Sequence, residues 1–367
     1  MPAAFSADRF PSGGAARGLD LSRRRLLLSA PLVLTVPLLG GCATAVPTST
    51  HLADALGSRL SAGDRAGFYA LFAGSAGAQA VALRMFDNLL DSGATIAAAS
   101  SDRLSVTWHL PGEPPVVSLA TVTLAGAVVD AIEPVSTGTE WLSDPMTVHA
   151  EASLVVASAR QDESARWLTA ARAGLAALAT VWPAGQRRTE PLIVLAPSDL
   201  VGFARYAGAD AQTTAAVTVV PGTTASEGVR VVVNPVAATN AVTDAATLTH
   251  EAVHAAMGSP RLTGTPGWLL EGIAEALTAR AHPSVAATNA AAARAAVAHG
   301  LPNALPDLSS ADPSGYALAQ VAVDAMVAHV GWTDVFDEAR RRSTPAGGRI
   351  ADAQVLTWYR DELARLR

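Results

Sequence analysis

The sequence contains no lysine, and all of its 26 basic residues are arginine. This bias reflects the coding sequence rather than a chemical requirement. Acidic residues outnumber basic ones by 32 to 26, and the net charge of −6 argues against a nucleic-acid partner. No run of like charge is long enough to indicate an interaction tail. The chain has a single cysteine, Cys42, which excludes an internal disulfide.

The sequence also lacks a stretch that would span a membrane comfortably. Its most apolar segment, residues 26–39, is short and is interrupted by two prolines. Three arginines precede this segment, and its last leucine begins the sequence L-G-G-C, which ends at Cys42. The order resembles a bacterial lipoprotein signal, in which the cysteine becomes the lipidated first residue after cleavage of residues 1–41. The resemblance implies a protein anchored to a membrane in the cell envelope, outside the cytoplasm.

Two alternatives stay open for this segment. One is an ordinary signal peptide that carries an incidental cysteine. The arginines before the apolar segment also resemble a twin-arginine export signal, so the choice between the twin-arginine and the general export route is not decided.

A possible metal site is encoded by residues 250–254, which read H-E-x-x-H. On a helix, His250 and His254 are one turn apart and share a face, where two imidazoles can bind one Zn²⁺. Glu251 projects from the same region and is placed to accept a proton from a water that zinc has acidified. The pattern therefore favours hydrolytic chemistry.

The helix that carries this motif is predicted over residues 243–257. Thr243 or Asp244 can cap its start, and Gly258 followed by Pro260 can end it. The alternative to a metal site is a polar helix face with two solvated histidines.

A second predicted helix, over residues 265–277, offers a third ligand. Glu271 and Glu275 lie four residues apart on a mainly apolar helix, where unpaired carboxylates would be costly. A zinc ion beside Glu271 would neutralise one charge, and Glu275 could accept a hydrogen bond from His250 and fix its tautomer. Two solvated glutamates are the alternative.

H-E-x-x-H followed by W-L-x-E-G-x-A-E resembles the gluzincin metallopeptidases, in particular the peptidase MA-like group, which share a thermolysin-like pair of active-site helices. The resemblance implies His250, His254 and Glu271 as zinc ligands, Glu251 as general base and Glu275 as a residue that supports a ligand. A metzincin would require glycine and histidine three and six residues after the second histidine. This chain has methionine and proline there.

The resemblance is sharp over residues 250–275, but it also extends to Tyr316. In gluzincin aminopeptidases a tyrosine in a similar place helps to hold the oxyanion, and a phenol can donate a hydrogen bond to that developing charge. The alternative is a core tyrosine with a satisfied hydroxyl.

The remaining pattern predicts an α+β protein with two domains. Residues 42–50 are a short tether, and helices followed by strands over 51–145 are loosely similar to NTF2-like (cystatin-like) domains, with a binding or spacer role. Residues 146–367 resemble a thermolysin-like zincin catalytic domain. Within it, residues 229–234 are predicted to be the edge strand that pairs with extended substrate, and a plain sheet strand is the alternative.

These predictions describe a lipid-anchored zinc metallopeptidase that hydrolyses a peptide or protein substrate, with Zn²⁺ as its cofactor. The alternative is a binding lipoprotein whose zinc site is a relic or purely structural. A structural zinc site usually has four protein ligands, and the sequence offers three. The substrate, the endo- or exopeptidase mode, the partner of the first domain and the oligomeric state are not encoded in these patterns.

Overall fold

The structure of the protein is a computed structural model, which describes residues 49–143, 145–186, 191–207, 214–223, 228–236, 240–308 and 313–367. The predicted signal peptide and Cys42 lie outside the described residues. Helices and two β-sheets alternate along the chain, which confirms the predicted α+β class. None of the described helices is both long enough and apolar enough to cross a membrane.

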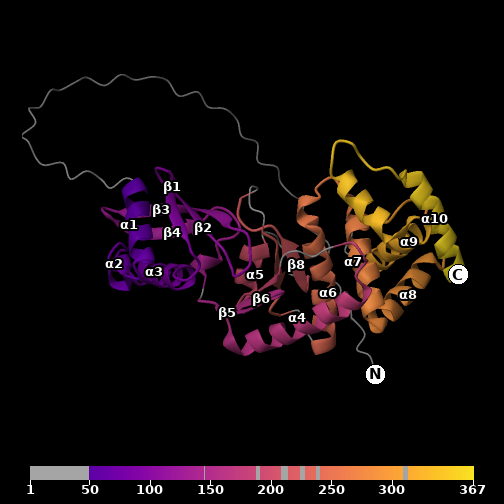
Figure 1. Ribbon diagram of the computed structural model, residues 1–367, viewed down its shortest axis with the longest axis horizontal. Helices are drawn as coiled ribbons and strands as arrows, with labels where there is room; N and C mark the ends of the chain where they lie inside the picture. Colours follow the sequence, from indigo (N-terminus) through magenta and orange to yellow (C-terminus); the bar gives the residue numbers. More distant parts are fainter. Residues whose placement is uncertain are drawn as a thin grey trace, which may run out of the picture. The chain divides into compact units, whose positions relative to one another are not determined.

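The first part of the chain builds three helices, a four-stranded antiparallel sheet of order β1-β2-β3-β4 and a 3-10 turn (Figure 1). The elements are α1 (Ser49–Ser61), α2 (Arg65–Tyr69), α3 (Ala76–Leu89), β1 (Thr95–Ser100), β2 (Arg103–Trp108), β3 (Val116–Ala125), β4 (Val128–Pro134) and η1 (Glu140–Leu142). Side chains alternate along β2 and β3, and the buried ones form one core with the buried faces of α1 and α3. The predicted order of helices first and strands afterwards is confirmed.

The second sheet has five strands in the order β5-β6-β7-β9-β8. They are β5 (Thr147–Glu151), β6 (Leu154–Ser158), β7 (Leu192–Ala196), β8 (Ala216–Val219) and β9 (Arg230–Val233). The central strands β6, β7 and β9 run parallel, whereas β5 and β8 pair antiparallel at the two edges. The prediction that residues 229–234 form an edge strand is therefore wrong. Strand β9 is buried throughout and paired on both sides, as its continuous valine run favours, and β8 is the edge.

Both faces of the central strands of this second sheet are buried. Leu154 and Val156 of β6 face a core that includes α4 and α6, whereas Val155 and Ala157 face the core of the first sheet. Successive side chains of β6 point to opposite faces of the sheet, so this one strand contributes side chains to both cores. As a result, one hydrophobic core crosses the predicted domain boundary at 145/146.

Two of the remaining helices connect strands of the second sheet, and the others follow β9 in sequence (Figure 1). The remaining helices are α4 (Gln161–Val181), α5 (Leu200–Ala207), α6 (Ala241–Met257), α7 (Gly267–Ala281), α8 (Pro283–Val297), α9 (Pro313–Arg342) and α10 (Asp352–Leu366), and a 3-10 turn, η2 (Ser259–Arg261), follows α6. Helix α9 is kinked at Gly331, where the backbone φ is 81°. The second predicted zinc helix corresponds to α7, and the first to α6.

The N-cap of α6 differs from the prediction. Asn240 caps the helix, and its side-chain oxygen accepts hydrogen bonds from the amides of Val242 and Thr243 at 3.0 Å. Asp244, one of the predicted caps, is instead buried and accepts a hydrogen bond from Arg166. The predicted end is confirmed, because Gly258 lies in the left-handed region with φ 65°.

Gly272 lets α7 pack tightly against α9. A Cβ atom at this position would lie 2.4 Å from the carbonyl oxygen of Ala319 and 2.7 Å from a methyl group of Val323. We therefore expect Gly272→Ala to push the two helices apart and to lower the free energy of unfolding by about 1–3 kcal/mol. Denaturant unfolding measures this loss. Gly77→Ala on α3, where nothing lies within 4 Å, is the control and should cost nothing. Equal stability of the two variants would contradict the close packing.

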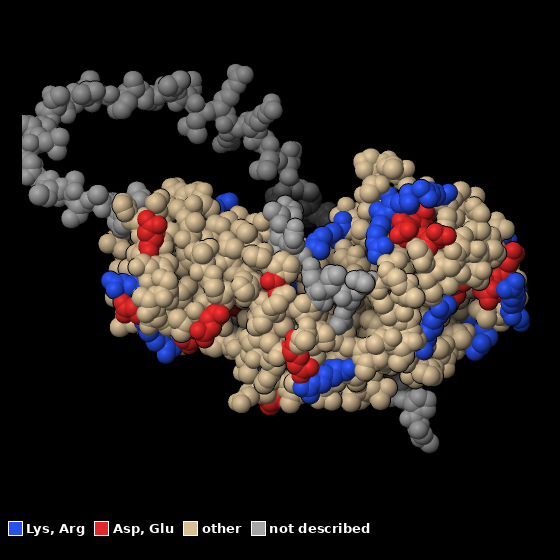
Figure 2. Space-filling model, viewed as in Figure 1, with Lys and Arg blue, Asp and Glu red and all other residues tan. Residues whose placement is uncertain are grey.

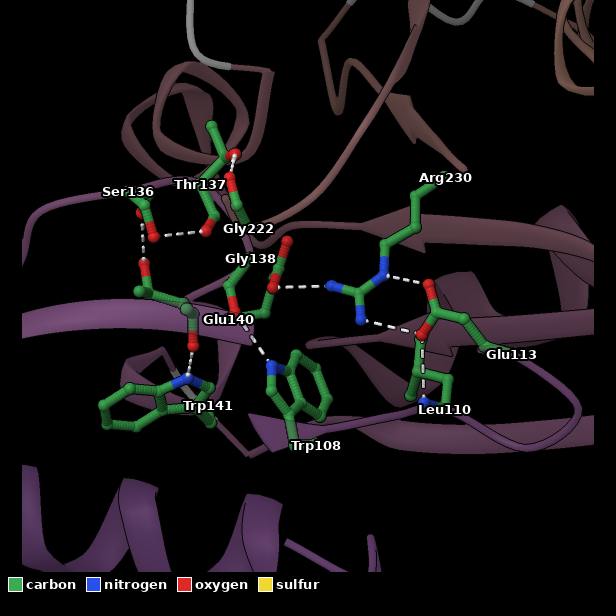
Figure 3. Close-up of polar contacts among 12 residues, drawn as sticks. Trp108, Leu110, Glu113, Ser136, Thr137, Gly138, Glu140, Trp141, Gly222 and Arg230 are labelled. Atoms are coloured by element: carbon green, nitrogen blue, oxygen red, sulfur yellow. Dashed lines mark hydrogen bonds and ion pairs between the residues drawn. The ribbon is translucent and has the colours of Figure 1, made fainter. Parts of the chain in front are cut away.

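A buried ion cluster joins the two sheets (Figure 3). Arg230 of β9 has no exposed surface, and it donates hydrogen bonds to both carboxylate oxygens of Glu113 at 2.8 Å and to Glu140 at 2.7 Å. Its guanidinium also stacks over the Trp108 ring, 4.5 Å from the centroid. Burial opposes the charge on Arg230, but the two carboxylates outweigh burial and raise its pKa further above its usual value. The cluster thus holds β9 to the first part of the chain through charge-assisted bonds.

Backbone contacts add to this junction on the β8 side. The Thr137 hydroxyl donates to the carbonyl of Gly222 at 3.2 Å, and the amide of Thr223 donates to the carbonyl of Val117 at 2.8 Å. A Cβ atom at Gly222 would lie 2.3 Å from that same carbonyl oxygen, so only glycine fits. The segment that follows β8 is therefore fixed against β3.

Exposed charges contribute less to the fold than this cluster does. Figure 2 shows basic and acidic residues in small mixed groups on one face of the molecule, with wide uncharged areas between them. Pairs such as Arg59 with Asp64 and Arg65 with Asp87 are largely solvent-exposed on their arginine side. Such pairs contribute little, because water and salt screen them. The stability therefore comes mainly from burial of apolar side chains in the two cores.

Candidate metal centre

Three side chains converge where α6 and α7 lie side by side. The Nε2 atoms of His250 and His254 are 3.0 Å apart, and Glu271 Oε2 lies 3.1 Å from the first and 3.2 Å from the second. The histidines come together because they are one turn apart on α6. Glu271 comes from the first turns of α7, which packs directly against α6. The predicted ligands thus form a triangle of three donor atoms.

The hydrogen bonds behind the histidines set the direction of their lone pairs. His250 Nδ1 lies 3.3 Å from Glu275 Oε1, and His254 Nδ1 lies 3.1 Å from the Ser259 hydroxyl. Both neighbours can accept a hydrogen bond, so each imidazole can carry its hydrogen on Nδ1 and present a lone pair at Nε2. In that tautomer three electron-rich atoms face one point, where a cation would be stabilised.

The triangle fits the geometry of a zinc site. Zinc bonds of about 2.0–2.2 Å at tetrahedral angles separate neighbouring ligand atoms by about 3.3 Å. The observed separations of 3.0–3.2 Å are close to that value. Zinc is intermediate between hard and soft metals, and two imidazoles with one carboxylate are among the donor sets that it favours. The residues therefore fit the metal that the sequence pattern predicts.

The charges of the site favour a cation as well. Burial alone would lower the pKa of His250, but hydrogen bonds to Glu271 and Glu275 outweigh burial and raise it well above its usual value. Burial would raise the pKa of Glu271, but hydrogen bonds with both histidines hold it well below its usual range. The site thus stabilises positive charge between the two helices.

Glu275 belongs to a polar chain that continues away from the site. Its Oε2 accepts a hydrogen bond of 2.8 Å from Asn289 of α8, and the Asn289 amide also donates to Gln320 of α9 at 2.8 Å. Gln320 in turn donates to Asp324 at 3.2 Å. The predicted supporting role of Glu275 is consistent with this placement. Sequence reasoning missed Asn289, because nothing local indicates which residue of α8 faces α7.

Glu251 lies beside the triangle rather than in it. Its side chain is 7% exposed and lines the same cavity as the two histidines. The Thr218 hydroxyl donates to Glu251 Oε2 at 2.5 Å. Thr218 lies on β8, the edge strand next to α6. Sequence reasoning missed this contact, since it treated another segment as the edge.

Tyr316 at the start of α9 also lines this cavity, which has a volume of about 680 Å³. The side chain is 42% exposed, so the alternative of a packed core tyrosine does not fit. Burial and the nearby carboxylates, with Glu271 the strongest, raise the pKa of its phenol. The hydroxyl therefore keeps its proton and can donate a hydrogen bond into the cavity.

Comparisons of the chain with protein-family models, with curated proteins and with solved structures found no match. The gluzincin resemblance therefore rests on the sequence motifs of the two helices.

Proposed function

We propose that the protein is a zinc metallopeptidase of the gluzincin type. The observation that supports it most is the triangle of His250, His254 and Glu271, with the Glu251 carboxylate beside it on one cavity wall. A metal with three protein ligands keeps a position open for reaction, and a neighbouring carboxylate gives that position a base.

Bound zinc would supply a Lewis acid that polarises the scissile carbonyl and acidifies a water. Glu251 accepts a proton from this water as the water oxygen adds to the carbonyl carbon. When the carbon–nitrogen bond breaks, Glu251 returns the proton to the leaving amine. The Tyr316 phenol donates a hydrogen bond to the carbonyl oxygen as negative charge develops there. An extended peptide would pair with the outer edge of β8, which lines the cavity and carries no further strand among the described residues.

The place of action is proposed from the sequence alone. The basic segment, the apolar segment and Cys42 support a lipid anchor in the bacterial envelope, with the peptidase outside the cytoplasm. The competing function is a binding lipoprotein whose zinc site is a relic or holds metal only structurally, without catalysis. The placement of Glu251 and Tyr316 on the cavity favours the enzyme, because a structural site has no use for a base or an oxyanion donor.

Zinc stoichiometry of purified residues 43–367 tests the proposal. We expect one zinc per chain. We expect Glu271→Ala to lose it, because only two imidazoles remain as ligands and two are too few to hold the metal. Glu275→Ala should keep zinc with an affinity about 10–100-fold lower, since it loses only the support of His250. Equal retention in both variants would contradict the ligand assignment. A folded protein without zinc would favour the binding lipoprotein.

A further inference from the structure

We infer that Thr218 is a positioning residue, which holds the Glu251 carboxylate in the orientation needed for proton transfer. This inference rests on the proposed function and adds a residue outside the two helices that carry the motif.

The contact between Thr218 and Glu251 is a short hydrogen bond. The Thr218 hydroxyl oxygen lies 2.5 Å from Glu251 Oε2 and 3.2 Å from the backbone carbonyl of the same residue. A hydroxyl has one hydrogen to donate, and hydroxyl–carboxylate bonds are typically about 2.5–2.7 Å long. The carboxylate is therefore the principal acceptor. Within the described part of the chain, no other side chain donates a hydrogen bond to it.

The sheet fixes where this hydroxyl points. Ala216, two residues before Thr218, belongs to the core that includes α6, whereas Val217 and Val219 pack against the opposite core. Side chains two residues apart share a face, so Thr218 faces α6. Its backbone is paired with Val231 of β9, which is fully buried.

The neighbouring contacts make this placement rigid. Arg230, next to Val231 on β9, is held by Glu113 and Glu140, and the segment after β8 is bonded to β3. The hairpin that carries Thr218 is thus anchored at both of its strands. A rigid donor of this kind restricts a flexible glutamate side chain.

The two oxygens of the Glu251 carboxylate have different roles in the proposed reaction. Thr218 occupies Oε2, which leaves Oε1 to accept the proton of the attacking water. Without the hydroxyl, Glu251 would sample orientations in which neither oxygen faces the water. Substrate binding would be unaffected, whereas the proton-transfer step would slow down.

The first test compares Thr218→Val, which keeps the shape and loses the hydroxyl, with Thr218→Ser, which keeps the hydroxyl. The probe is a quenched-fluorescent peptide chosen from a random library by cleavage with the wild-type protein. We expect Thr218→Val to lower kcat about tenfold with KM within a factor of two, and Thr218→Ser to restore most of kcat. Thr147→Val on β5, the opposite edge strand, is the matched control and should leave kcat unchanged.

The second test does not depend on turnover. Acetohydroxamate, a zinc chelator that passes a proton to a neighbouring base, is titrated into zinc-loaded protein by calorimetry. We expect Thr218→Val to weaken binding about fivefold in the wild-type background and to have no effect in Glu251→Gln. This non-additivity is the signature of action through Glu251, and additive losses would overturn the inference.

The outcomes separate this inference from the proposed function. If the wild-type protein binds zinc and cleaves peptides, and Thr218→Val has an unchanged kcat, only the role of Thr218 fails. If Thr218→Val and Thr218→Ser lose stability and zinc to the same extent, the threonine is structural and the inference also fails. If the wild-type protein binds no zinc, the proposed function itself fails.

Discussion

Glu251→Gln is expected to abolish peptide hydrolysis while the zinc stays bound. Glutamine has nearly the same shape as glutamate, but its neutral amide cannot accept a proton from water. The Thr218 hydroxyl can still donate to the amide oxygen, so the side chain should keep its place. Glu251 is not part of the ligand triangle, so the three candidate zinc ligands are unchanged in this variant. We expect kcat to fall at least about 10³-fold, with one zinc per chain in elemental analysis.

Glu133→Gln is the matched control, because this glutamate is exposed on β4 in the other sheet. It should keep full activity. Two results would contradict the assignment of Glu251. Hydrolysis within tenfold of the wild-type rate would mean that another group takes the proton. Loss of zinc together with activity would mean that Glu251 coordinates the metal or holds α6 in place.

The candidate ligands could be predicted because their geometry is mostly local. A spacing of four residues on one helix brings His250 and His254 together whatever the rest of the fold does. The same spacing places Glu271 and Glu275 on one face of α7, so that a single contact between two helices completes the arrangement. Gly272 could also be recognised in the sequence, because it is part of the motif. The need for glycine there comes from the close approach of Ala319 on α9, which is visible only in the structure.

The residues that sequence analysis missed depend on long-range pairing. The order of strands in a sheet is not written in any one strand, and β8 lies outside β9 although it precedes it in sequence. The edge was therefore assigned to the more apolar segment, and the contact of Thr218 with Glu251 went unseen. Asn289 was missed for the same reason, since its partner Glu275 lies on another helix.

The two-domain division is informative in a similar way. The sequence predicts a boundary near residue 145, because the resemblance to a zincin catalytic domain begins at residue 146. The alternation of β6 and β7, however, sends two side chains of each strand into the core of the first sheet. Only the structure shows that the buried charges of this junction, Glu113 and Glu140, meet a single arginine of β9.

Arg230→Met is expected to destabilise the protein by about 3–5 kcal/mol. Methionine fills much of the same volume, but it leaves Glu113 and Glu140 buried without a cation, and an uncompensated buried charge is costly. Denaturant unfolding of residues 43–367 measures the change. Arg365→Met is the control for loss of an ordinary ion pair, because Arg365 is 73% exposed in its pair with Glu362. Its effect should be below about 1 kcal/mol.

The triple variant Arg230→Met, Glu113→Gln, Glu140→Gln separates charge from packing. With both carboxylates neutralised, the penalty of unpaired charge disappears, and most of the lost stability should return. A triple variant as unstable as Arg230→Met would instead attribute the loss to the stacking on Trp108 and to the hydrogen-bond geometry. β9 pairs with β8, which carries Thr218, so Arg230→Met is also expected to lower kcat. If the triple variant recovers both kcat and stability, the buried cluster supports catalysis by holding the β8–β9 pair in place. Recovery of stability without kcat would show that the position of β8 depends on the arginine itself.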